Sequence, residues 1–78
     1  GMEALRLSQW AQASVQALCD GGMIAPPPDP GSAARAPALT WLKRLRQSPG
    51  AAADWLTAMM AGPDPDTIMA WLAGSPRA

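Results

Sequence analysis

The sequence of 78 residues contains no histidine and no tyrosine, and it has one cysteine, Cys19, and one lysine. These are side chains that often act as general acids, general bases or nucleophiles, and Cys19 has no imidazole to activate it. We therefore expect that the protein is not an enzyme and has no catalytic residue. A lone cysteine cannot form an intramolecular disulfide, so the sequence favours the reducing cytoplasm.

Metal ligands are also scarce. A zinc site needs three or four cysteine, histidine or carboxylate ligands, and this chain has one cysteine and six scattered acidic residues. Asp64 and Asp66 lie close together, but they stand at the start of a predicted helix, where acidic residues usually act as caps. Glycine-rich phosphate loops are absent. The sequence thus predicts no metal site and no cofactor.

The chain lacks net charge and long apolar runs. Six basic and six acidic side chains cancel, which removes the long-range attraction expected towards nucleic acids or anionic membranes. No apolar run approaches the roughly 18 residues of a membrane span, and Gln9, Gln12 and Gln16 interrupt any signal-peptide core. We expect a soluble protein with no membrane partner.

What the chain does contain is helix-forming residues. Hydrophobic residues make up 49% of it, including 17 alanines, eight leucines, five methionines and four tryptophans, which is enough for one small core. The sequence predicts a single helical domain over residues 1–78. Gly1 before Met2 is typical of tag cleavage, so we expect Met2 to be the natural start. The alanine- and proline-rich composition suggests a GC-rich bacterial genome.

The clearest helix is predicted over residues 3–20, where apolar residues recur at helical spacing. Gly21 and Gly22 follow it as a typical helix end. Cys19, on the flank of this helix, is expected to fill a small apolar space. The predicted buried face consists of Leu7, Trp10, Ala11, Ser14, Val15 and Leu18.

A long connection follows this helix. Residues 21–36 include four prolines between Pro26 and Pro30, which remove backbone donors and fix φ. We expect this connection to be ordered, with its prolines forming a stiff, extended strap that carries the chain across the helices.

Three shorter helices are predicted over residues 37–47, 49–61 and 65–73. Ser48 with Pro49, and Asp64 with Pro65, have the pattern of an N-cap followed by proline in the first turn. The whole pattern predicts an all-α fold, a small bundle of about four short helices with the proline-rich strap between the first and the second.

One tryptophan falls on the apolar face of each predicted helix. A small bundle needs one large side chain per helix, so we expect these residues to form the core. An alternative is a tryptophan-lined pocket that binds a small molecule. The four residues are Trp10, Trp41, Trp55 and Trp71.

Methionines near the C-terminal end provide the main functional hypothesis. Met59, Met60, Met69 and Trp71 form a candidate partner surface, because flexible thioethers beside an indole suit an adaptable apolar contact. The sequence therefore favours a small non-catalytic protein–protein interaction or accessory module, which binds another protein or forms a homodimer.

A basic cluster provides another alternative. Lys43, Arg44 and Arg46 could associate weakly with nucleic acid. Three charges are few, however, and the exposed face of the next helix has none of the arginine, asparagine or glutamine side chains that read base edges. We expect a solvated helix face at these positions and no nucleic-acid partner.

Overall fold

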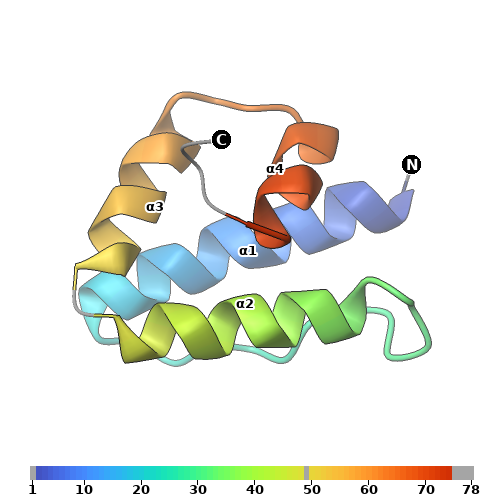
Figure 1. Cartoon of the computed structure of the whole chain (residues 1–78), viewed down its shortest axis with the longest axis horizontal. Coiled ribbons are helices and arrows are strands. Elements are labelled where there is room, and N and C mark those ends of the chain that lie inside the picture. Colours follow the sequence, from blue (N-terminus) through green and yellow to red (C-terminus); the bar gives the residue numbers. More distant parts are fainter. Residues whose placement is uncertain (1, 49, 75–78) are drawn as a thin grey trace.

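The structure is a computed structural model, and it describes residues 2–48 and 50–74. These residues form the helices α1 (Met2–Asp20), α2 (Arg35–Gln47), α3 (Ala51–Met60) and α4 (Pro65–Leu72), and they contain no strand (Figure 1). The prediction of an all-α bundle of about four short helices is confirmed.

Helix α1 is the centre of the bundle. It packs against the other three helices and most extensively against α3 and α4. Figure 1 shows α2 along one side of α1, with both helices running in the same direction. The predicted face of α1 is the face that packs, because Leu7, Ala11 and Val15 are fully buried and Leu18 is half-buried. The helical spacing of apolar residues therefore located the core.

The C-terminal end of α1 stops at glycine as predicted, but Cys19 near this end is not buried as expected. Gly21 adopts a left-handed φ of 73°, and the N–H of Gly22 donates to the carbonyl oxygen of Ala17 over 2.8 Å, as expected for a glycine helix end. Cys19 is exposed, so the expectation that it fills an apolar space is wrong. Leu18 packs against the core, and Cys19 points about 100° away from it around the helix.

Residues 21–34 connect α1 to α2 and contact α1 at successive points back towards its N-terminus. The carbonyl oxygen of Ala25 accepts a hydrogen bond from the Trp10 indole over 2.7 Å. Asp29 then pairs with Arg6 over 3.2 Å, and the Ser32 hydroxyl donates to Glu3 over 2.7 Å. These three contacts hold the connection on the surface of α1.

Helix α2 begins earlier than predicted. It starts at Arg35 after Ala34, whereas Pro37 was expected near its first position. Proline is still compatible there, because the first turn of a helix has N–H groups without intrahelical acceptors.

Helix α3 begins later than predicted. The residue before it is Gly50, which has a left-handed φ of 85° and provides no side-chain cap. Ser48 was expected to be the N-cap, but it ends α2 instead, and its carbonyl oxygen accepts from the N–H of Ala51 over 3.0 Å. Pro49, the other half of that prediction, lies outside the described residues.

The predicted cap of α4 is confirmed. Asp64 precedes the helix, and its carboxylate accepts a hydrogen bond from the N–H of Thr67 over 2.7 Å, with Pro65 in the first turn. This hydrogen bond holds the pKa of Asp64 below its ordinary value of 3.8, because it stabilises the charged carboxylate.

Candidate functional site

The four tryptophans form a continuous row, with one ring from each helix. The ring centroids of Trp10 and Trp41 are 5.6 Å apart, those of Trp41 and Trp55 are 5.3 Å apart, and those of Trp55 and Trp71 are 6.2 Å apart. All three pairs meet edge to face, with interplanar angles of 66° to 78°, which is a preferred geometry for aromatic pairs. The first three rings are buried and Trp71 is half-buried. The core placement of the tryptophans is thus correct for three of the four.

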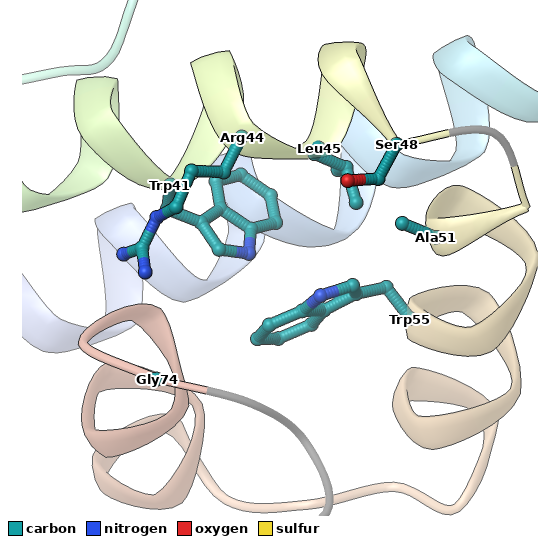
Figure 2. A pocket seen from close by; sticks show the side chains of 7 residues that line it. All are labelled: Trp41, Arg44, Leu45, Ser48, Ala51, Trp55 and Gly74. Carbon is teal, nitrogen blue, oxygen red and sulfur yellow. The ribbon is translucent and has the colours of Figure 1, made fainter.

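The indole of Trp41 differs from that of Trp10 in its hydrogen bonding. Trp10 has its hydrogen bond to Ala25, whereas Trp41 Nε1 is buried and has no hydrogen-bond partner among the described residues. In Figure 2 the nitrogen of Trp41 lies on the side of its ring that faces Trp55. A buried donor without an acceptor is unfavourable, and an N–H directed at an aromatic ring compensates only in part.

A pocket opens beside the contacting rings of Trp41 and Trp55, where the end of α2 meets the start of α3 (Figure 2). Its volume is about 150 Å³. Arg44 extends past the ring of Trp41 towards the end of α4, and Ser48 lies on the opposite side. The described residues that line the pocket are Trp41, Arg44, Leu45, Ser48, Ala51, Trp55 and Gly74.

The signal for this pocket lies in the spacing of its residues along the sequence. Trp41, Arg44, Leu45 and Ser48 stand at positions i, i+3, i+4 and i+7, which places all four on one face of a helix. Trp41 and Leu45 were assigned to the core and Arg44 to the solvent, so their common face was not considered as a site.

The charges near the pocket are mainly positive. Helix α2 has no acidic residue, and it carries Arg35, Lys43, Arg44 and Arg46. Within residues 2–48 and 50–74 the one ion pair is that of Arg6 with Asp29, so none of these four cations is neutralised there. Lys43, Arg44 and Arg46 are exposed, but at about 100° per residue the directions of Arg44 and Arg46 differ by about 160°. The three bases therefore do not form one stripe.

The candidate partner surface is divided in the structure. Met59 is buried in the core at 7% exposure, whereas Met60 is 80% exposed. Met69 and Trp71 are both half-buried, and at about 100° per residue they point about 160° apart, on opposite sides of the buried face of α4. The structure does not bring the four residues together as one patch.

The chain has no match among known protein-family models, curated proteins or solved structures. In the part of the chain that the structure describes, no three acidic or cysteine side chains gather where they could hold a metal ion. None of the described helices combines the length and the hydropathy of a membrane span.

Proposed function

We propose that the protein is a small non-catalytic interaction module that binds another protein, or a second copy of itself, through apolar side chains on α3. The observation that carries this proposal is the 80% exposure of Met60 at the end of α3. Leu56, one turn earlier, is half-buried and packs against the core, so the two side chains form an apolar edge on one flank of the helix. Such an edge suits an adaptable contact, because methionine has a flexible and polarisable side chain.

The same proposal places the protein in the cytoplasm. Its single cysteine is exposed, and an exposed thiol without a disulfide partner is suited to a reducing compartment.

The test compares two methionine substitutions. Met60→Asp places a charge on the proposed contact, and Met23→Asp is the matched control, because Met23 is 97% exposed in the connection between α1 and α2. Tagged wild type and both variants are used for co-purification from the source organism, after circular dichroism has shown that all three are helical. Any protein recovered is then purified and titrated with each variant by calorimetry, and self-association is followed by sedimentation.

We expect wild type and Met23→Asp to bind the same purified partner, or to dimerise, and Met60→Asp to lose most of that affinity. An aspartate at a well-packed interface position leaves a desolvated charge, which costs more than the lost contact itself. Equal affinity of the two variants, or a wild type that is monomeric and binds no purified partner, contradicts the proposal.

A second candidate function is the binding of a small molecule. The specific observation in its favour is the pocket beside Trp41 and Trp55, because aromatic walls with one charged side chain at the edge are common in ligand sites.

A further inference from the structure

We propose that the pocket beside Trp41 and Trp55 binds a carboxylate that is carried by one ring-sized apolar group. The proposal names the chemistry of the ligand, which neither candidate function above specifies.

The charge of the pocket selects an anion. Arg44 is the single charged side chain among the described residues that line it, and no described acid pairs with Arg44. A guanidinium has five N–H donors in a fixed plane and matches the two oxygens of a carboxylate. The remaining bases of α2 add to the positive potential without lining the pocket. A cationic ligand would be repelled.

The walls of the pocket select the apolar part. Two indole rings, Leu45 and Ala51 supply apolar surface beside the polar side chains of Arg44 and Ser48. A volume of about 150 Å³ is large enough for a benzene-sized group. Flat rings also gain from edge-to-face contact with indoles. A ligand much larger than one ring would extend into solvent.

The indole of Trp41 meets the pocket with its ring. Trp41 is 2% exposed, its Nε1 has no described acceptor, and it is directed towards the ring of Trp55. Because this N–H is covered by the neighbouring ring, a ligand in the pocket would contact the ring of Trp41 and not its Nε1.

Two sources could supply this chemistry. One is a free aromatic acid. The other is the last residue of a polypeptide, because there the carboxylate and the apolar side chain lie close enough to enter a pocket of this size together. The second source rests on the proposed function as a protein interaction module, and the first does not.

The experiment follows the four indole N–H signals in a ¹H–¹⁵N spectrum during titrations. Benzoate represents the free acid, and N-acetylphenylalanine represents the chain end. Benzamide and N-acetylphenylalaninamide are the neutral controls of similar shape. We expect one or both carboxylates to produce saturable shifts that are largest at Trp41 and Trp55, and each amide to bind more weakly than its acid. The acid that binds more tightly identifies the source.

A pair of arginine variants tests the anchor. Arg44→Gln is expected to weaken binding about tenfold, the loss typical of one charge-assisted hydrogen bond at an exposed site. Arg46→Gln is the control, because Arg46 is equally an exposed base of α2 but does not line the pocket, and it should bind as wild type does.

The proposal is overturned if neither carboxylate gives a saturable shift, if the amides bind as tightly as the acids, or if Arg44→Gln binds with unchanged affinity. Failure of the proposed function would leave these titrations unaffected, because they contain no partner protein. If the pocket binds neither acid, the result of the Met60→Asp binding experiment is likewise unaffected.

Discussion

The indole N–H of Trp10 donates a hydrogen bond to the carbonyl oxygen of Ala25 over 2.7 Å, so a core side chain of α1 directly holds the segment that leads to α2. We expect Trp10→Phe to lower the free energy of unfolding by about 1 kcal/mol more than Trp41→Phe does, because only the first substitution removes a hydrogen bond. Urea denaturation of both variants measures the difference. A Trp41→Phe variant that is destabilised as much as Trp10→Phe would show that the contact with Ala25 contributes little.

Ile68 and Leu72 are the two large fully buried side chains of α4. Ile68 lies in the middle of the helix and Leu72 at its end. Replacing Ile68 with alanine removes three buried carbon atoms and leaves a cavity, so we expect Ile68→Ala to cost about 2–5 kcal/mol. A domain of this size has little stability in reserve, and this variant should be largely unfolded at physiological temperature. Met60→Ala is the control, with an expected change below about 0.5 kcal/mol. Thermal unfolding followed by circular dichroism compares the two.

Gly50 enables the turn between α2 and α3 through its φ of 85°. A Cβ added there would meet no atom within 4 Å, so the cost of Gly50→Ala is conformational strain, about 1 kcal/mol. Gly31→Ala is a matched control, since its Cβ also meets open space and its φ is not in the left-handed region. It should be neutral or slightly stabilising. Equal stability of the two alanine variants would mean that the turn can relax to accommodate a side chain.

Asp64 makes the stability of α4 depend on pH. Its pKa in the folded state is lowered, first by the hydrogen bond from the Thr67 N–H. The stabilising contribution is therefore complete above the unfolded pKa and is lost as the pH falls through the folded pKa. Asp64→Asn keeps an oxygen acceptor but does not titrate at this position.

We expect wild type to lose more stability than Asp64→Asn between neutral pH and acid below pH 3.8, the ordinary value for this carboxyl. Chemical denaturation at several pH values measures this difference. Parallel pH profiles for the two proteins would show that the cap is not coupled to protonation.

The helices could be predicted because their signals are local. Apolar spacing located the buried face of α1, and the Asp64–Pro65 pattern located the start of α4. At the start of α3 two local signals competed. A serine–proline pair favoured a start at residue 49. Gly50 follows directly in the left-handed conformation, and the helix therefore begins at Ala51.

The arrangement of the candidate site could not be predicted in the same way, because it depends on how the helices pack against one another. Helical spacing placed each tryptophan on an apolar face, but the order of the rings follows from how the helices pack, as does the half-exposure of Trp71. For the same reason the spacing could not separate buried Met59 from exposed Met60, which are neighbours in sequence. Cys19 illustrates the same limit, because its position on the flank of α1 does not show whether another helix covers it.

The length of the segment between α1 and α2 determines the direction of α2. Helix α1 has 19 residues, or about 28 Å at the usual rise per residue. An extended chain of 14 residues, 21–34, can reach about 43 Å, which is enough to return along the whole of α1 and to include a turn. A short loop would have reached only the near end of α1 and forced α2 to run antiparallel. The parallel arrangement of α1 and α2 is therefore made possible by the reach of a segment that has no regular secondary structure.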